Sequence, residues 1–436
     1  MDPRNFRFAH LADAHVGAWS RDPAVRQALR TSVLAALELV ERREAEFLLI
    51  SGDLFHTPIP DPGEVAPVAA ALRRLTEGGR RIYVIYGSHD YVAHRVSWLD
   101  VLAETGIFLR AAPDPVRAEG ERWTLPFTVD APTQARIAGI SGRAHGLDRG
   151  AFASVDSGAF RTEPGFKIFQ FHAAIDEFLP APFRGHIRGI PVTSLPAGCD
   201  YYAGGHIHFS YSATLPGGGL LVNPGAVFGT SIKDLEYAAE GRTHQGVVIV
   251  EVRDGRPTAE FVDTTPRGLV RVFDINVEGR STGDARTVVQ EEVAAHAAPG
   301  ALLFPRIHGS LSEGSTASLG LRTSHADAAA RGAAAVHWDL QDTTSAKGTS
   351  GEAAGSSEPV DEEVFLELGR SADPILAELA GEDGVRRMRE LLRELGLVRV
   401  EGESAADYRA ARLDGGLRAL GVARRTGREA RVDDAT

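Results

Sequence analysis

The sequence predicts an α/β protein built around a largely parallel, buried β-sheet. Short apolar runs at 6–11, 47–50 and 81–86 are typical of buried strands. Two amphipathic helical patterns separate these runs, and such alternation is typical of a parallel sheet covered by helices. We therefore expect a βαβαβ unit at the N-terminus, with more strands and a smaller α+β unit after it.

The two helices of this unit are bounded by recognisable signals. The first is expected over 23–43, since Pro23 suits the first helical position and Asp22 the capping position before it. The second is expected between the Pro-rich stretch 57–63 and Gly78, a residue type that commonly ends helices. Each helix then leads the chain into the next parallel strand.

Later apolar runs predict the remaining strands. In the first domain they are expected at 136–140, 167–171, 201–203, 219–223 and 246–252, and the polar stretch 254–266 closes the domain. In the smaller unit, strands are expected at 269–277, 302–308 and 336–340, with a helix at 284–295.

The chain beyond residue 341 changes in composition. It is first rich in Gly, Ser, Thr and Ala, which is typical of a flexible linker, and helical patterns follow. These helices are short, so we expect them to need a partner to be stable. The expected regions are a first domain at 1–264, a second at 265–341, a linker at 342–360, a helical segment at 361–421 and a disordered tail at 422–436.

Composition limits the class of protein. The 436 residues carry a formal net charge of −12, which argues against coating nucleic acid by bulk positive charge, although a local basic groove or bound metal ions could attract phosphate. The single cysteine, Cys199, rules out an internal disulfide and suits a reducing cytosol. No signal-peptide pattern follows Met1, and no apolar run approaches ~18 residues. We therefore expect a cytoplasmic protein without a membrane span.

Aspartate and histidine residues stand at or just after the ends of several predicted strands. Taken singly, Asp53 would be a cap of the next segment and His172 a core histidine. Together they are hard to explain by structure alone, because ligands of open α/β sheets bind outside the carboxyl ends of the strands. The residues are Asp13, His15, Asp53, His89, His172, His206 and His208.

These side chains suit divalent metal ions. Carboxylates and imidazoles are hard-to-borderline ligands that fit manganese, iron or zinc. No thiolate accompanies them, which weighs against a structural zinc site. Asp53 is the natural bridge, because the two oxygens of one carboxylate can bind two cations. Two cations ~3.5–4 Å apart can clamp a phosphate and activate a water for in-line attack.

The order and spacing of five motifs resemble the calcineurin-like metallophosphoesterases. These motifs are Asp13-x-His15, Gly52-Asp53, Gly87-Ser88-His89-Asp90, His172 and Gly205-His206-Ile207-His208. Further stretches, Gly17-Ala18-Trp19, Leu54-Phe55-His56 and Asn223-Pro224-Gly225-Ala226, are similar to the SbcD and meiotic-recombination-eleven family of nucleases. The resemblance implies an α+β or α/β fold: a four-layer β-sandwich flanked by helices, a small α+β capping domain for DNA recognition and C-terminal helices.

The resemblance also implies a role for each motif residue. His89 would face the scissile phosphate, stabilise it and protonate the leaving oxygen. Asp90 would hydrogen-bond the His89 ring and raise its basicity. Two divalent ions, expected to be Mn²⁺, would be held by Asp13, His15, Asp53 and His208 (metal one) and by Asp53, Ser88, His172 and His206 (metal two).

Ser88 departs from the family pattern, which usually has asparagine at this position. A serine hydroxyl is shorter than an asparagine amide and a weaker neutral donor. Ser88 would bind metal two directly, through water or after a small loop shift, or it would be a turn residue only. We expect metal two to bind more weakly than in relatives with asparagine, or to be more selective for manganese.

The function that the resemblance implies is a DNA nuclease of double-strand-break repair, with 3′-to-5′ exonuclease activity on duplex ends and endonuclease activity on single strands. It implies a nucleoid-associated homodimer that binds an SbcC-type (Rad-fifty-type) coiled-coil ATPase through 361–421. No Gly-x-x-x-x-Gly-Lys loop is present, so energy from ATP would come from that partner. A small-molecule phosphodiesterase or phosphatase on the same site, and a catalytically weakened scaffold at DNA ends, are the alternatives.

The histidines without a partner motif, expected to be structural or exposed, are His56, His94, His145 and His244.

Overall fold

The computed structural model of the chain divides into two compact units, Met1–Ser345 and Ala346–Thr436. In the first unit it describes residues 5–90, 96–112, 122–142, 148–185, 187–266 and 268–344. In the second unit it describes only 386, 387, 390, 394, 414–416, 418 and 419, all helical. The expected linker from 345 on, the tail at 422–436 and most of the helical segment at 361–421 therefore lie outside the described residues.

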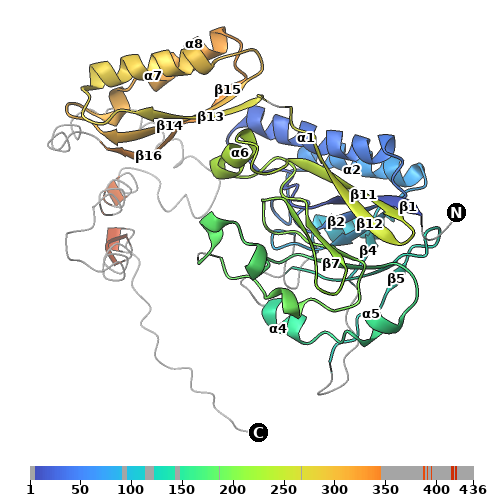
Figure 1. The fold of residues 1–436 in the computed structure, drawn as a ribbon. Coiled ribbons are helices and arrows are strands. Elements are labelled where there is room, and N and C mark those ends of the chain that lie inside the picture. The colour runs from blue at the N-terminus through green and yellow to red at the C-terminus, as the bar shows by residue number, and fades with distance from the viewer. Residues whose placement is uncertain are drawn as a thin grey trace, which may run out of the picture. The chain divides into compact units, whose positions relative to one another are not determined.

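The first sheet contains the predicted βαβαβ unit (Figure 1). Its strands β1, β2 and β3 pair in parallel, and β11 joins β1 antiparallel. The edge strand β12 lies in the polar stretch that was expected only to close the domain. Its side chains alternate between exposed and half-buried, so few apolar residues mark it in the sequence. In sheet order the strands are β12 (Arg256–Asp263), β11 (Gly246–Arg253), β1 (Phe6–Leu11), β2 (Phe47–Ser51), β3 (Arg81–Ile85) and β4 (Leu109–Arg110).

The second sheet packs against the first through an aromatic layer. Phe8 stacks on Phe47 of the first sheet with ring centroids 4.9 Å apart, and Tyr201 of the second sheet meets Phe8 edge-on at 5.0 Å. All three side chains are fully buried. In sheet order the strands are β5 (Thr128–Val129), β6 (Arg136–Ile140), β7 (Lys167–Phe171), β8 (Tyr201–Ala203), β10 (Leu220–Asn223) and β9 (Tyr211–Thr214).

Helices cover the outer faces of both sheets and complete the four layers expected from the sequence. Leu29 of α1 and Leu72 of α2 pack in one cluster with Leu48 of the first sheet. Phe160 of α5 packs with Phe169 of the second sheet. The helices are α1 (Pro23–Arg42), α2 (Pro62–Glu77), α3 (Trp98–Glu104), α4 (Asp148–Ala153), α5 (Gly158–Thr162) and α6 (Ile232–Ala239). No described helix is long and apolar enough to cross a membrane.

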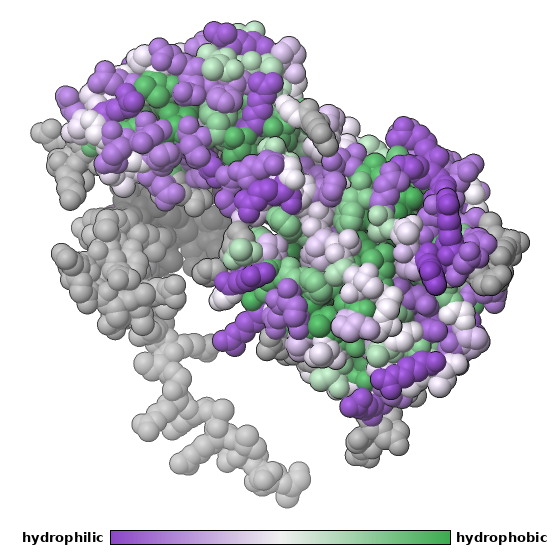
Figure 2. Space-filling model, viewed as in Figure 1, coloured by the Kyte–Doolittle hydropathy of each residue, from purple (hydrophilic) through white to green (hydrophobic). Residues whose placement is uncertain are grey.

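A smaller sheet follows, with two helices that present mainly hydrophilic residues in the view of Figure 2. Helix α8 was not predicted, because only Ser324 and Ala328 are buried in it. Strand β16 continues to Thr344, so the expected domain boundary at 341 falls inside a strand. The elements are β13 (Val270–Asn276), α7 (Thr282–His296), β14 (Leu302–Ser310), α8 (Leu321–Ala330), β15 (Ala335–Val336) and β16 (Asp339–Thr344).

Asp22 does not cap α1 with its side chain, contrary to expectation. Its Oδ2 instead lies 2.9 Å from Nδ1 of His337, which follows β15. The Asp22 carboxylate is therefore turned toward His337 and not toward the first turn of α1. This contact connects the start of α1 with the smaller sheet.

A buried carboxylate, Asp130, connects the two large sheets. It accepts two hydrogen bonds from the Arg81 guanidinium, at 2.7 and 2.9 Å, and one from the Tyr83 hydroxyl at 2.7 Å. Replacing Asp130 by alanine is expected to lower the free energy of unfolding by about 3 kcal/mol, because both donors lose their acceptor. Urea denaturation measures this. The control is Arg73→Ala, which breaks the exposed Arg73–Glu77 pair and should cost about 0.5 kcal/mol or less; equal losses would contradict the prediction.

Candidate metal centre

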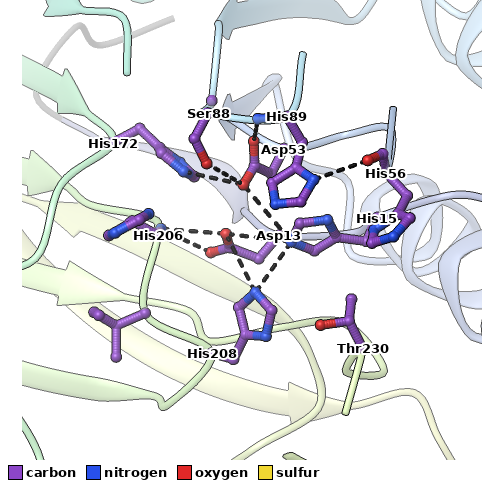
Figure 3. A network of polar contacts seen from close by, with 12 residues as sticks. Asp13, His15, Asp53, His56, Ser88, His89, His172, His206, His208 and Thr230 are labelled. Carbon is purple, nitrogen blue, oxygen red and sulfur yellow. Dashed lines mark hydrogen bonds and ion pairs between the residues drawn. The ribbon is translucent and has the colours of Figure 1, made fainter. Parts of the chain in front are cut away.

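The candidate residues lie at the carboxyl ends of β1, β2, β3, β7 and β8 (Figure 3). Four of them have positive φ angles that only glycine adopts readily: 51° at Asp13, 45° at His15, 52° at Asp53 and 92° at His206. Backbone hydrogen bonds hold two of these turns together, from Asp13 N to Gly52 O and from His15 N to Asp53 O. Unusual backbone at several points of one site is typical of functional centres, where the surrounding structure enforces it.

The metal-one side consists of Asp13, His15, Asp53 and His208, whose side chains converge. Nε2 of His15 lies 3.0 Å from Nε2 of His208, 3.7 Å from Asp53 Oδ2 and 3.9 Å from Asp13 Oδ1. Two ligands bound to one cation at ~2.1 Å and at right angles are about 3 Å apart. Two imidazole nitrogens that face each other among carboxylates therefore fit a shared divalent cation. Asp13, His15 and His208 form a group that could hold a metal ion.

Asp234 orients His208. Its Oδ2 accepts from His208 Nδ1 at 2.9 Å and from the N–H groups of Thr230 and Ser231. Burial alone would lower the pKa of His208, but Asp234 raises it above its ordinary value. The bond at Nδ1 leaves Nε2 to face the metal-one side, an arrangement typical of metal-binding histidines. Sequence reasoning missed Asp234, although the capping box Ser231-x-x-Asp234 at the start of α6 was a signal for it.

The metal-two side consists of Ser88, His172 and His206 with Asp53. His172 Nδ1 donates to the Ser51 carbonyl at 2.8 Å, which turns Nε2 toward Asp53 Oδ2 at 3.2 Å. That Nε2 is fully buried and makes no well-aligned hydrogen bond. Burial would lower the pKa of His172, but the Asp53 carboxylate raises it to about 10. A buried imidazole nitrogen aimed at a carboxylate fits a cation between them, and Asp13, Asp53 and His172 form a second possible metal group.

Ser88 and His206 contribute less directly to the metal-two side than His172 does. The Ser88 hydroxyl donates to Asp53 Oδ2 at 3.3 Å, so it lies on the metal-two side but is bonded to the carboxylate. The His206 ring lies beside His172, with ring centroids 5.1 Å apart, but none of its nitrogens joins the described metal groups. The backbone N–H of His206 donates to both Asp13 oxygens, at 3.2 and 3.0 Å. The structure thus assembles the metal-one side more completely than the metal-two side.

Asp53 lies between the two sides. Its Oδ2 faces both His15 and His172, while its Oδ1 accepts from the backbone N–H of His89 at 2.8 Å. Burial alone would raise the pKa of Asp53, but His172 and His15 hold it well below its ordinary value. The carboxylate therefore stays ionised, as a bridging metal ligand must.

Among the described residues, only one ring nitrogen of His89 has a hydrogen-bond partner. Its Nδ1 lies 2.8 Å from the carbonyl oxygen of His56; a carbonyl can only accept, so Nδ1 carries the hydrogen. Nε2 is left for a substrate. The rings of His89 and His15 are 4.8 Å apart, which places this nitrogen next to the metal-one side.

The expected role of Asp90 is wrong. Asp90 does not bond the His89 ring; its buried carboxylate accepts from the backbone N–H groups of Leu54, Phe55 and Gly87. Burial and the nearby Asp53 raise its pKa to about 7. Adjacent residues of a tight turn point in different directions, so Asp90 holds the loops after β2 and β3 together while His89 faces outward.

His56 was expected to be structural or exposed, but it belongs to the site. Its ring stacks on His89 with centroids 5.2 Å apart, and its nitrogen lies close to those of His15 and His89. Its place in the stretch Leu54-Phe55-His56, directly after Asp53, was a signal for this. His244 is exposed and pairs with Asp263 at 3.0 Å, as expected. His94 and His145 lie outside the described residues.

Comparison with known proteins agrees with this geometry. Residues 6–210, which include every candidate ligand, match the calcineurin-like phosphoesterase family. The chain therefore contains a calcineurin-like metallophosphoesterase domain, a hydrolase domain of a family that uses divalent metal ions.

The chain is also similar to named proteins. It is 26% identical to the DNA double-strand break repair protein Mre11 of Methanopyrus kandleri over 288 residues, 62% of this chain and 60% of that protein. It is 24% identical to the Mre11 of Archaeoglobus fulgidus over 63% of each chain. It is 25% identical to the uncharacterized metallophosphoesterase YhaO of Bacillus subtilis over 46% of this chain and 48% of that one. The chain thus spans less than two thirds of each of these relatives.

Proposed function

We propose that this chain is a manganese-dependent DNA nuclease of double-strand-break repair. The observation that carries the proposal is the position of Asp53, which has possible metal ligands on both sides and His89 beside it. Similarity to Mre11 proteins over more than half of the chain supports DNA as the substrate. We expect 3′-to-5′ exonuclease activity on duplex ends and endonuclease activity on single strands.

The metal ligands and His89 would have different roles in the reaction. Two divalent cations, when bound, would neutralise charge on the phosphate and activate water for in-line attack. The mixed oxygen and imidazole donors are compatible with manganese. His89, held by the His56 carbonyl, would bind the phosphate through Nε2 and, in its protonated form, donate that proton to the leaving oxygen.

A substrate panel tests the proposal. The chain is incubated with Mn²⁺ and with end-labelled duplex DNA, circular single-stranded DNA, cyclic nucleotides and aryl phosphates. We expect metal-dependent shortening of the duplex from its 3′ ends and internal cleavage of the circular single strand. Cleavage of the small substrates alone would refute the nuclease, and binding of DNA ends without any cleavage would favour the scaffold.

A small-molecule phosphoesterase is the second candidate. A stretch of 82 residues is 35% identical to the UDP-2,3-diacylglucosamine hydrolase of Ectopseudomonas mendocina, although it covers only 18% of this chain. A protein similar to part of this chain is thus named for a substrate other than DNA. The larger coverage by the Mre11 proteins favours DNA.

We further propose a homodimer joined to a coiled-coil ATPase at the nucleoid, with 265–341 as the capping domain. Apolar side chains near α3 support self-association, because Ile59, Val96 and Val101 are 67%, 68% and 41% exposed. The Trp98 N–H donates to the Pro58 carbonyl, which brings the two loops of this patch together. The segment 361–421, which would bind the ATPase, lies mostly outside the described residues.

Ser88→Asn is expected to tighten binding of the second Mn²⁺ about tenfold. An amide oxygen reaches farther than the hydroxyl, which donates to Asp53 instead of facing a cation freely. Isothermal titration of the native and variant chains with Mn²⁺ measures both sites. The first-site affinity serves as the internal control, and equal second-site affinities would show that Ser88 does not limit the metal-two side.

A further inference from the structure

A chain of buried hydrogen bonds crosses from the first sheet to the second beneath the metal centre. His10, on β1, lies 2.9 Å from the Tyr201 hydroxyl through Nδ1 and 2.9 Å from the Ser51 hydroxyl through Nε2. The Ser51 hydroxyl lies 3.1 Å from the carbonyl oxygen of Ala203. The three side chains are completely buried. These hydrogen bonds connect the end of β2 with β8, the strand before His206 and His208.

One assignment of the hydrogens satisfies all three of these side chains. A carbonyl only accepts, so Ser51 donates to Ala203 and must accept from Nε2–H of His10. Nδ1 of His10 then accepts from the Tyr201 hydroxyl. The opposite tautomer would leave the Tyr201 hydroxyl without an acceptor among the described residues. Burial lowers the pKa of His10 to about 3, so the ring is neutral, as these hydrogen bonds require.

Ser51 connects these hydrogen bonds to the metal-two side. Its carbonyl oxygen accepts the Nδ1 hydrogen of His172 at 2.8 Å, and Asp53 follows two residues later. The backbone passes very close to this carbonyl, since a Cβ added to Gly205 would lie 2.2 Å from it. A small displacement of Ser51 would therefore change the direction of the His172 ring and its distance from Asp53.

Stability alone does not explain a polar chain at this place. Aromatic side chains surround it, and Phe8 already packs against Tyr201. Replacing hydrogen-bonded partners by apolar groups of similar shape is often nearly neutral for stability. Buried polar networks can instead fix one arrangement of the groups around them.

We propose that His10 is a positioning residue, whose bond to Ser51 holds the Ser51 carbonyl against His172 and so aims His172 Nε2 at Asp53. The inference rests on the proposed role of His172 as a metal-two ligand. It assigns a function to the first strand in addition to presenting Asp13 and His15. We call the bond from His10 to Ser51 the inner bond and the bond from Tyr201 to His10 the outer bond. The outer bond leaves the hydrogen of His10 on Nε2, where the inner bond needs it.

Substitutions of His10 separate the inner bond from the outer one. His10→Phe removes both bonds. His10→Gln places an amide near the position of Nε2 and keeps a donor for Ser51, whereas His10→Asn places an amide near Nδ1 and keeps only the contact with Tyr201. Phe8→Leu, in the same layer, is the control for loss of packing without loss of a hydrogen bond.

Two measurements on the whole chain test the inference. Proton–nitrogen-15 spectra of the histidine-labelled, metal-free protein detect ring N–H groups that are protected by a hydrogen bond. We expect the His172 Nδ1–H group, bonded to the Ser51 carbonyl, to be protected from exchange in the native chain and in His10→Gln and Phe8→Leu, and to lose this protection in His10→Phe and His10→Asn. In Mn²⁺ titrations, His10→Phe should weaken the second site about tenfold and leave the first within about twofold.

The inference is overturned if His10→Phe retains the protected His172 Nδ1–H group of the native chain, or if Phe8→Leu and His10→Phe weaken the second site equally. A wrong metal assignment would give a different experimental result from a wrong role for His10. If the native chain binds no second ion, the proposed two-metal site fails, while the spectra of the metal-free chain still decide whether His10 positions His172.

Discussion

Asp53→Asn is expected to reduce DNA cleavage at least ~1,000-fold and to weaken the binding of both metal ions. Oδ2 of Asp53 is 3.7 Å from His15 Nε2 on the metal-one side and 3.2 Å from His172 Nε2 on the metal-two side. An asparagine has the same shape but no charge and only one oxygen. It can offer that oxygen either to the two sides or to the His89 N–H, but not to both.

The measurements are cleavage of labelled DNA and Mn²⁺ titration of the same variant. Asp61→Asn is a matched control, because Asp61 is an exposed cap of α2 that lies outside the metal groups. It should cleave and bind metal like the native chain. Native cleavage by Asp53→Asn would refute the assignment, and loss of only one ion would show that Asp53 is not the bridge.

The sequence predicts the buried part of the fold well, because burial leaves a pattern in the residues. The apolar run in β2, Phe47 to Ile50, is completely buried, and the helices begin and end near their expected signals. Elements with few buried apolar residues left no such pattern. Strand β12 lies at a sheet edge with half-exposed side chains, and helix α8 buries only small residues. Both were missed.

The sequence also places the candidate ligands at the right strand ends, because the carboxyl ends of parallel strands meet at one edge of a sheet. It does not predict directions of side chains within turns. Asp90 points to the backbone of two loops rather than to its neighbour His89. His56 and Asp234 reach the centre through tertiary contacts. The sequence patterns around them mark both residues but do not specify these contacts.

His89→Ala is expected to reduce cleavage ~100-fold or more and to leave binding of both metal ions unchanged. The side chain of His89 is held by the His56 carbonyl, with Nε2 free, and its connection to Asp53 runs through the backbone N–H, which alanine keeps. The loss should therefore appear in the rate and not in metal affinity. Single-turnover cleavage at saturating Mn²⁺ measures the rate, and titration measures the affinity.

His244→Ala is the matched control, since His244 is an exposed histidine paired with Asp263 and remote from the described metal groups. A second variant, His56→Phe, keeps the carbonyl at position 56 and a ring to stack on His89. If His89 acts on the phosphate, His56→Phe should retain far more activity than His89→Ala. If His89→Ala instead weakens metal binding in parallel with the rate, then His89 supports the metal-one side, next to His15, and another group must contact the phosphate.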